Sequence, residues 1–553
     1  MAANVVLIIT DQDRARPSYE RVALRCPARE RLRASGLSFE QHRIASAACV
    51  PSRASMFTGH SPWVHGVTQT DGLAKGHDDP AMRWLSPTQL PTLGHCLRAL
   101  DYDAAYLGKW HLSAADLRDG QGTVATVRRE GRRGVRAPAG EARYREANPL
   151  SAFGFDGWIG PEPHGAAMHN SGTIRDPLYA EQAVEWLRER GRRFEGGERK
   201  PFFLAVNFVN PHDIVFWPEW SVFRPRWLGS GVPSSPPPPT AGLGVKELLR
   251  EPPVRNQYRD RYLRAYGPPD LIRSAYELRG EAYRRFYHAL IERVDRHIAA
   301  VLDALDAQPF AEQTAVIWTA DHGELLGAHD MHQKWFNAFE ETVRVPFVVR
   351  APQLRARAGQ RVEERSSHLD LLPTILGLAG AGKGTAARAR LETQLDERFP
   401  KARPWPGQDL LAERAELDSY FVTADAIVNG NQRLAAVTRR APALRRLSML
   451  HYTPIDGCAT GVEALVGSVE GRPYKLCQTF DPRGTVLDTL ALNPRQRFPG
   501  ERELFDLEAD PAEARNLAGQ SATAQIEAAL VRRLGAARAA VGGPKAGEVA
   551  LLD

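Results

Sequence analysis

The sequence predicts an α/β protein with a large, mostly parallel sheet between layers of helices, followed by a smaller α+β subdomain. In the first two thirds of the chain, short apolar runs alternate with longer segments that have helical spacing of apolar residues. Further on, several strand-like runs follow one another before a last helical segment. We therefore expect a main domain over residues 1–395 and a C-terminal subdomain over residues 396–553. With 553 residues, 43% of them hydrophobic, the chain can bury a large core.

Five apolar runs are predicted to be strands of the large sheet. Each is short and ends at polar or turn-forming residues, as is typical of strands buried on both faces. These runs are Val5–Ile9, Ala104–Leu107, Phe202–Val209, Ala315–Trp318 and Val345–Val349. The segments between them repeat apolar residues at helical spacing, which favours parallel strands joined by helices. The predicted helices are Leu93–Leu100, Tyr179–Leu187, Phe286–Leu305 and Leu369–Leu378.

Three segments interrupt this order. Leu112–Pro149 is polar and rich in arginine, and we expect it to be an exposed insertion. Pro233–Pro239 cannot form a helix or a central strand, so it is predicted to be an extended surface loop. Ala381–Arg403 resembles a linker in its Gly, Ala and Arg content.

Beyond that linker the pattern changes to consecutive strands and one final helix. The predicted strands are Ser419–Ile427, Arg433–Arg439, Arg446–Tyr452 and Tyr474–Phe480. Ile526, Leu530 and Leu534 mark the last helix. A run of strands followed by a helix is typical of an α+β unit.

Composition excludes several classes of protein. The net charge of +6 is small for this length, and the basic run Arg128–Arg136 lacks interleaved aromatics, so we interpret it as a solvated loop and expect no nucleic-acid partner. No stretch reaches about 18 consecutive apolar residues, and the N-terminal run Asn4–Thr10 lacks a basic leader, so we expect no membrane partner and no secretory signal. Five cysteines are too few for a disulfide framework, which favours a cytoplasmic enzyme with reduced thiols.

Polar clusters follow three of the predicted strands. They are Asp11-Gln12-Asp13, Asn210-Pro211-His212-Asp213 and Asp321-His322-Gly323. Ligands of open α/β sheets bind at the carboxyl ends of strands, and oxygen donors there suit a divalent cation such as Ca²⁺ or Mg²⁺. Taken singly, each cluster is more typical of a turn or a helix cap than of a metal site.

The segment Cys49–Gly59 (CVPSRASMFTG) is more specific. Pro51 suits the first turn of a helix, which places Cys49 at a helix N-terminus, where anions are favoured and a thiol becomes reactive. Arg53 lies one turn further on and would face the same anion. The alternative for an isolated cysteine is a buried free thiol beside a turn.

These residues resemble the sulfatase family of the alkaline-phosphatase superfamily, whose motif is Cys-x-Pro-Ser-Arg followed by Thr-Gly. The resemblance spans nearly the whole chain, in the order of the family. Its further elements are Gly108–Leu112, Asn210–His212, Asp321–Glu324 with Lys334, Arg344–Pro346, Glu503–Leu507, Asp510-Pro511 and Asn516-Leu517.

The resemblance implies a specific chemistry at Cys49. A maturation enzyme would oxidise this cysteine to Cα-formylglycine, whose hydrated form is a geminal diol. One hydroxyl, activated by the metal, would attack sulfur and displace the alcohol. Deprotonation of the other would then expel sulfate.

The resemblance also implies a divalent metal, with Ca²⁺ expected first and Mg²⁺ or Mn²⁺ as alternatives. Its ligands would be Asp11, Gln12, Asp321 and His322, with Cys49 as formylglycine completing the set. Many sulfatases have a second aspartate in place of Gln12 and often asparagine in place of His322. This departure leaves the identity of the metal open, and Asp13 is an alternative ligand.

The remaining site residues are also carried over from the family. Arg53 and Lys109 would orient the diol and neutralise sulfate, and His111 would be the base for the second hydroxyl. His212 would be the acid for the leaving group, and Lys334 would clamp the sulfate.

Three functions are weighed. The first is hydrolysis of a small-molecule sulfate monoester, aryl or small alkyl, by an enzyme that can be a homo-oligomer. The second is hydrolysis of phosphonate monoesters or phosphodiesters with the same formylglycine machinery. Related formylglycine enzymes catalyse this reaction, and some of them also have the Asp-Gln pair; the intact Gly-Lys-Trp-His element favours the first function. The third is a non-catalytic anion-binding protein, which would have lost Cys49, Arg53 or a metal ligand, and none is lost.

Overall fold

The computed structural model describes most of the chain. The described residues are 3–16, 24–72, 75–79, 82–120, 122–131, 133–165, 167–223, 252, 254–255, 258–259, 263, 269–400, 402–425, 461–480 and 501–543. The predicted loop 233–239 and the predicted strands 433–439 and 446–452 lie outside them. None of the described helices is long and apolar enough to cross a membrane.

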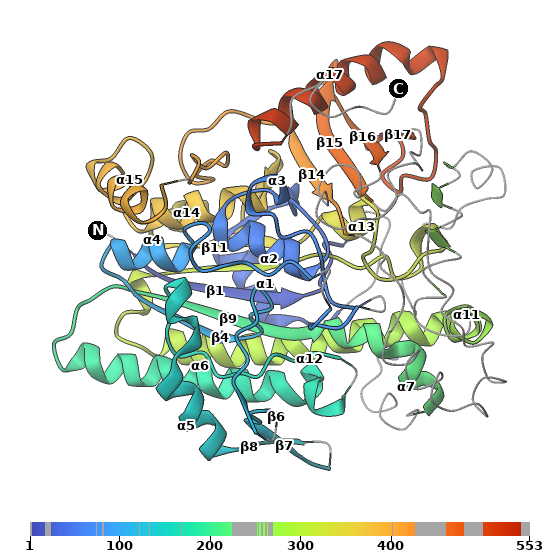
Figure 1. Cartoon of the computed structure of the whole chain (residues 1–553). Helices are drawn as coiled ribbons and strands as arrows, with labels where there is room; N and C mark the ends of the chain where they lie inside the picture. The colour runs from blue at the N-terminus through green and yellow to red at the C-terminus, as the bar shows by residue number, and fades with distance from the viewer. Residues whose placement is uncertain are drawn as a thin grey trace.

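A seven-stranded sheet forms the centre of the molecule (Figure 1). Its strands, in spatial order, are β12 (Arg361–Val362), β2 (Leu37–Phe39), β11 (Phe347–Arg350), β10 (Thr314–Ala320), β1 (Asn4–Asp11), β9 (Phe202–Pro211) and β4 (Asp103–Gly108). The strands β4, β9, β1 and β10 are parallel, whereas β11 runs antiparallel to β10. The predicted α/β class and the five predicted strands are confirmed.

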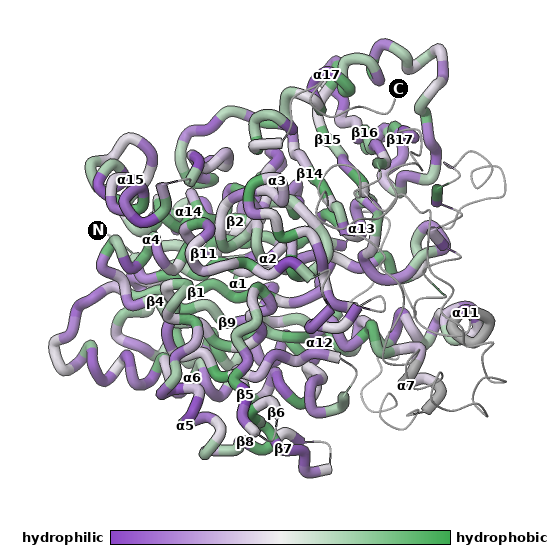
Figure 2. The backbone as a smooth tube through the Cα atoms, viewed as in Figure 1, coloured by the Kyte–Doolittle hydropathy of each residue, from purple (hydrophilic) through white to green (hydrophobic). Residues whose placement is uncertain are grey.

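Helices cover both faces of this sheet, as Figure 1 shows for α6 (Gly172–Glu195) and α12 (Gly280–Asp306) on one side and α2 (Cys49–Thr58) and α14 (Leu371–Leu378) on the other. Alternate residues of β1 point to opposite faces, so one set packs in each of two apolar cores. Both cores lie along the apolar strands that Figure 2 colours green. The sheet is therefore buried on both faces, which explains its nearly continuous apolar strands.

Further elements connect the layers or extend them. They are α1 (Pro27–Ser35), β3 (His42–Arg43), α3 (Pro62–His65), α4 (Leu93–Ala99), α7 (Trp217–Phe223), α11 (Pro269–Glu277), α13 (Glu340–Val343) and β13 (Ser366–Ser367).

Two interpretations of the interrupting segments need correction. The described residues of the basic run 128–136 are exposed or half-buried, but they form the antiparallel hairpin of β7 (Val127–Glu130) and β8 (Arg133–Arg136) instead of a loop. The predicted linker contains a helix, α15 (Ala386–Arg398). Its Leu391 and Leu395, four residues apart, are buried against the core, so two apolar side chains were enough to dock a helix whose composition resembles a linker.

The insertion 112–149 also holds the short hairpin of β5 (Arg118–Asp119) and β6 (Gly122–Thr123), followed by α5 (Pro138–Ala147).

A second, antiparallel sheet follows near the C-terminus, covered by α17 (Ala524–Ala540). Its strands are β14 (Ser419–Thr423), β15 (Gly461–Val469), β16 (Arg472–Phe480) and β17 (Arg502–Asp506). β14, β16 and the final helix agree with prediction, whereas β15 and β17 were not predicted.

A buried ion network joins this second sheet to the main domain. Lys475 on β16 donates to the carbonyl oxygen of Ala338, and its Nζ lies 2.7 Å from carboxylate oxygens of both Glu340 and Glu513. Glu340 also pairs with Arg43 at 2.8 Å. The charge of Glu340 is thus compensated from both parts of the chain, as a buried carboxylate requires.

Candidate active site

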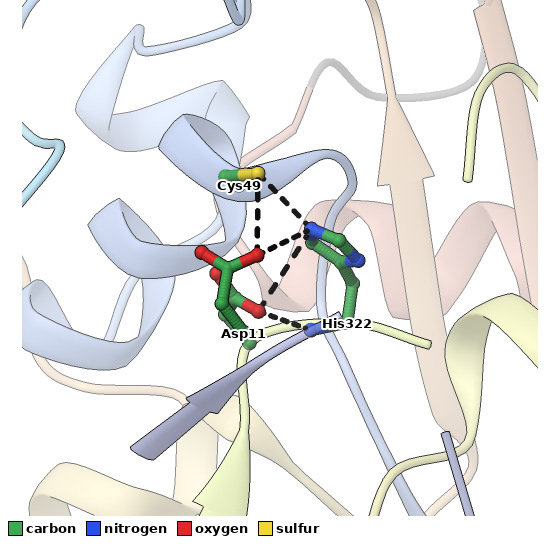
Figure 3. A group of neighbouring side chains, drawn as sticks. Asp11, Cys49 and His322 are labelled. Carbon is green, nitrogen blue, oxygen red and sulfur yellow. Dashed lines mark hydrogen bonds and ion pairs between the residues drawn. The ribbon is translucent and has the colours of Figure 1, made fainter. Parts of the chain in front are cut away.

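The parallel sheet gathers four potential ligand side chains at one edge. Asp11 is the last residue of β1, Asp321 and His322 directly follow β10, and Cys49 opens α2. All four are buried, and one ligand atom from each lies within 4.8 Å of the others. Figure 3 shows Asp11 and His322 converging on the Cys49 sulfur. The strand ends thus meet the helix N-terminus at one point, as the sequence predicted.

Cys49 lies at the first position of α2, which is buried along its whole length. Its Sγ is 3.1 Å from Nε2 of His322 and 3.9 Å from Oδ1 of Asp11. Gly59 ends the helix in the left-handed conformation, with φ of 69°. The predicted helix start, with Pro51 in its first turn, is confirmed.

The tautomer of His322 suits metal binding. Its Nδ1 lies 2.9 Å from the carbonyl oxygen of Gly323, which can only accept, so Nδ1 carries the hydrogen. Nε2 then presents a lone pair toward Cys49 and Asp11. Burial lowers the pKa of His322, which favours the neutral ring that a metal requires.

Two cations are directed at the two aspartates. Arg53 donates from Nη2 to Oδ2 of Asp11 at 3.1 Å and from Nε to Oδ2 of Asp321 at 2.9 Å, and Lys109 Nζ lies 2.5 Å from Oδ2 of Asp11. Burial opposes the charge of Asp11, but Lys109, His212 and Arg53 together hold its pKa well below the usual range. Asp11 is therefore ionised, and its Oδ1 remains on the Cys49 side.

A tight turn after β4 presents Lys109. Gly108 has φ of 90°, and a Cβ at this position would lie 1.9 Å from the carbonyl oxygen of Asn207. Only glycine fits so close to the neighbouring strand. The glycine of the Gly-Lys-Trp-His element is thus explained by backbone packing, and the lysine follows it toward Asp11.

Gln12 and Lys334 lie beside the four potential ligand residues and are hydrogen-bonded to each other. Lys334 Nζ donates to Oε1 of Gln12 at 2.7 Å, and Nε2 of Gln12 donates to Glu324. The backbone N–H of Gln12 donates to Oδ1 of Asp321 at 3.0 Å. The amide of Gln12 is therefore oriented by Glu324, a residue for which the sequence predicts no role.

The alternative ligand Asp13 is engaged elsewhere. Its Oδ2 pairs with Arg29 at 2.7 Å and accepts a hydrogen bond from Thr10.

His212 follows β9, at the start of a short 3₁₀ turn, His212–Phe216. Burial, reinforced by the positive charges of Lys109 and Lys334, holds its pKa well below the ordinary value. The electrostatic influence of these two lysines places His212 near the same centre.

His111 belongs to a different cluster. Its Nε2 lies 2.5 Å from Oδ1 of Asp71, and Nδ1 of His164 lies 2.8 Å from the other oxygen of Asp71. Sequence reasoning found His111 but missed Asp71 and His164. In the sequence, Asp71 is 40 residues from His111, and His164 is 93 residues from Asp71. Neither lies in a periodic segment or a recognisable motif, so no local signal pointed to them.

The four-residue group fits a divalent cation in its donor chemistry. It offers two carboxylates, one imidazole lone pair and the position of Cys49, all within 4.8 Å. Carboxylate oxygens suit Ca²⁺, Mg²⁺ or Mn²⁺, and a neutral imidazole is an acceptable fourth donor for the last of these. Two carboxylates this close favour a bound cation, because the charges of Arg53 and Lys109 fall mainly on the opposite oxygens.

Comparison with known proteins identifies the family. The protein family described as "Sulfatase" matches residues 3–381, which is more than half of the chain. The multifunctional alkaline phosphatase superfamily protein PehA of Trinickia caryophylli is 26% identical, with 95% of this chain and 92% of that protein covered. The choline-sulfatase of Rhizobium meliloti is 24% identical, with 93% and 82% covered.

Solved structures share the fold. The phosphonate monoester hydrolase SpPMH of Silicibacter pomeroyi aligns with a TM-score of 0.58 at 19% identity, covering 97% of this chain and 95% of that one. A sulfatase described with the glycosaminoglycan metabolism of Bacteroides thetaiotaomicron gives 0.60 at 18% identity, with 98% and 97% covered. The fold is thus that of alkaline-phosphatase-like hydrolases, with a candidate metal centre at its sheet edge. Within that class, the chain belongs to the sulfatase family.

Proposed function

We propose that this protein is a sulfuric ester hydrolase that cleaves sulfate monoesters of aryl or small alkyl alcohols. The observation that carries the proposal is the position of Cys49. It is buried at the N-terminus of α2, against Asp11 and His322, with Arg53 and Lys109 at the same carboxylates. A nucleophile at this position would meet an anionic ester where three positive side chains converge, those of Arg53, Lys109 and Lys334.

The proposal includes a divalent metal, Ca²⁺ in the first instance and Mg²⁺ or Mn²⁺ as alternatives, and the conversion of Cys49 to Cα-formylglycine. Asp11, Gln12, Asp321, His322 and residue 49 would hold the cation, which supplies Lewis-acid activation when bound. Cys49 is 1% exposed, so we expect the transient maturation enzyme to act before the chain folds around it.

The other side chains take the roles that the resemblance to the family implies. Arg53 and Lys109 orient the nucleophilic group and offset the charge of the ester. Lys334 binds a sulfate oxygen, and His212 donates a proton to the departing alcohol. His111 accepts the proton whose removal releases sulfate.

The competing function is hydrolysis of phosphonate monoesters or phosphodiesters by the same residues. A phosphonate monoester hydrolase among the structural relatives supports this competing function. Sulfate and phosphonate esters are also both tetrahedral monoanions. Steady-state assays with aryl sulfate, aryl phosphonate monoester and phosphodiester of one shared alcohol separate the two. We expect the highest kcat/KM for the sulfate. A higher value for either phosphorus ester would overturn this ranking.

Mass spectrometry of the peptide that contains residue 49 tests the chemistry directly. Protein produced with the maturation enzyme should show conversion of the thiol to an aldehyde. An unmodified protein with full activity would refute the mechanism.

A further inference from the structure

Asp71 joins two imidazoles through separate oxygens. Oδ1 is 2.5 Å from Nε2 of His111, and Oδ2 is 2.8 Å from Nδ1 of His164. An ionised carboxylate can only accept, so each of these nitrogens must carry a hydrogen. Burial opposes the charge of Asp71, but His111 and His164 hold its pKa well below the usual range, so the carboxylate is ionised.

The other ring nitrogen of His111 is the informative atom. Nδ1 is buried, and it has no hydrogen-bond partner in the described part of the chain. Because Nε2 carries the hydrogen, Nδ1 is the ring nitrogen that can hold a lone pair and take up a proton. An unpaired acceptor is costly to bury unless a ligand or a reacting group uses it.

We propose that Asp71 is a positioning residue that fixes His111 as the Nε2–H tautomer, so that Nδ1 is the atom that takes up a proton during turnover. The inference rests on the proposed function, which gives His111 the part of a base. A carboxylate that orients an imidazole and selects its tautomer is worth orders of magnitude in rate in the serine proteases, although the fold there is unrelated.

The surroundings of Asp71 keep it in place. The ring of His77 stacks on that of His164 with centroids 4.8 Å apart, and Trp84 packs against both His111 and His164. The next residue, Gly72, lies against the indole of Trp335, to which a Cβ at Gly72 would be 3.4 Å away. Because Trp335 directly follows Lys334, the loop that carries Asp71 borders the proposed site.

Ring ¹⁵N chemical shifts of labelled histidine test the tautomer without turnover. The samples are protein with unconverted Cys49, and the His111 signals are assigned by their loss in His111→Gln. We expect a protonated Nε2 and an unprotonated Nδ1 in the wild type. In Asp71→Asn and Asp71→Leu, the His111 signals should move toward the average of the two tautomers. Unchanged His111 shifts in both variants would overturn the proposal.

Kinetics of the converted enzyme supply the second readout. Asp71→Asn should lower kcat by about 10²–10⁴-fold, and KM should fall with it so that kcat/KM changes little, because the slowed step follows release of the alcohol; an initial burst of alcohol should precede the slow steady state. The double variant Asp71→Asn/His111→Gln should lose little beyond His111→Gln alone, because the two residues act as a unit. Additive losses would show that Asp71 acts independently of His111 and would contradict the proposal.

A control and a separating outcome complete the design. Asp119→Asn, on the exposed β5–β6 hairpin, should leave shifts and rates unchanged. Full turnover in His111→Gln would show that His111 is not the base of the proposed function. It would also refute the inference that Nδ1 of His111 takes up a proton during turnover. The shift experiment decides independently whether Asp71 sets the tautomer, so the two failures are distinguishable.

Discussion

Two clusters that contain histidine lie at the candidate site, and they are built differently. The first, around Cys49, takes its residues from two strand ends and a helix start, and the side chains of Asp11, Asp321 and His322 are completely buried. The second, around Asp71, comes from loops, and its side chains are 7% to 17% exposed. The contrast indicates that the sheet fixes the position of Cys49, the proposed nucleophile, whereas loops supply the second cluster.

The largest effect should come from the first cluster. Cys49→Ala removes the only position from which the proposed nucleophile can be made, so kcat should fall by about 10⁶-fold, as loss of a nucleophile does in a serine protease. Steady-state assays measure the loss, and thermal unfolding should show a folded protein. Cys96→Ala, another buried thiol, serves as the control and should retain activity. Activity in Cys49→Ala would exclude covalent catalysis at this residue.

Asp321→Asn tests whether the same cluster holds a metal. The substitution removes a negative charge from the ligand set while it keeps the shape of the side chain. Mutation of a residue that only hydrogen-bonds to a metal ligand typically lowers metal affinity by roughly 10–100-fold. Loss of the ligand charge in Asp321→Asn should lower the affinity by more than this, and activity should fall with it. Elemental analysis after dialysis measures the metal. Asp330→Asn on the following loop is the control, and unchanged metal content in Asp321→Asn would remove this residue from the ligand set.

His212→Ala separates proton donation from binding. A proton donor matters most when the alcohol is a poor leaving group, so a poorly activated sulfate ester should lose about 10²-fold or more in kcat/KM. An ester of an acidic phenol should lose little. The dependence of log kcat/KM on the pKa of the leaving alcohol measures the difference. Parallel losses for both kinds of ester would argue against the role as an acid.

The smallest expected effect is on stability and arises next to the second cluster. Burial raises the pKa of Glu162 from 4.5 to about 6, although it accepts a hydrogen bond from the backbone of Trp110. The charged form is thus disfavoured in the fold. The cost is absent below pH 4.5, grows as pH rises to about 6, and then stays near 2 kcal/mol, from about 1.4 kcal/mol per pKa unit.

Glu162→Gln should therefore raise the free energy of unfolding by up to about 2 kcal/mol at pH 8 and have no effect below pH 4.5. Denaturant titrations across this pH range measure the change. Glu146→Gln, on the exposed face of α5, should be neutral throughout. A constant difference at every pH would mean that ionisation of Glu162 is not its cause.

The first cluster was predictable and the second was not, for a physical reason. The carboxyl ends of parallel strands meet at one edge however far apart they are in the sequence, so Asp11 and Asp321 could be paired from apolar periodicity alone. His111 was found because Gly108 and Lys109 precede it in a family motif. Asp71 and His164 reach it through irregular loops, whose paths no periodicity specifies.

The same distinction applies to the fold. Strongly apolar strands such as β1 and β9 were predicted within a few residues, because burial on both faces leaves little sequence freedom. The sequence predicts a linker where α15 lies, since Leu391 and Leu395 are its only buried residues. β15 and β17 were missed because the pairing of the second sheet is set by contacts between distant segments.

The ion pair between Lys475 and Glu340 bears on whether this chain can be truncated. The sulfatase match ends at residue 381, yet Glu340 takes one of its two positive partners from beyond that point. A fragment cut at the family boundary would bury a carboxylate that is only half neutralised, and it would uncover the apolar surface that faces the second sheet. Residues beyond position 381 therefore contribute contacts that stabilise the main domain.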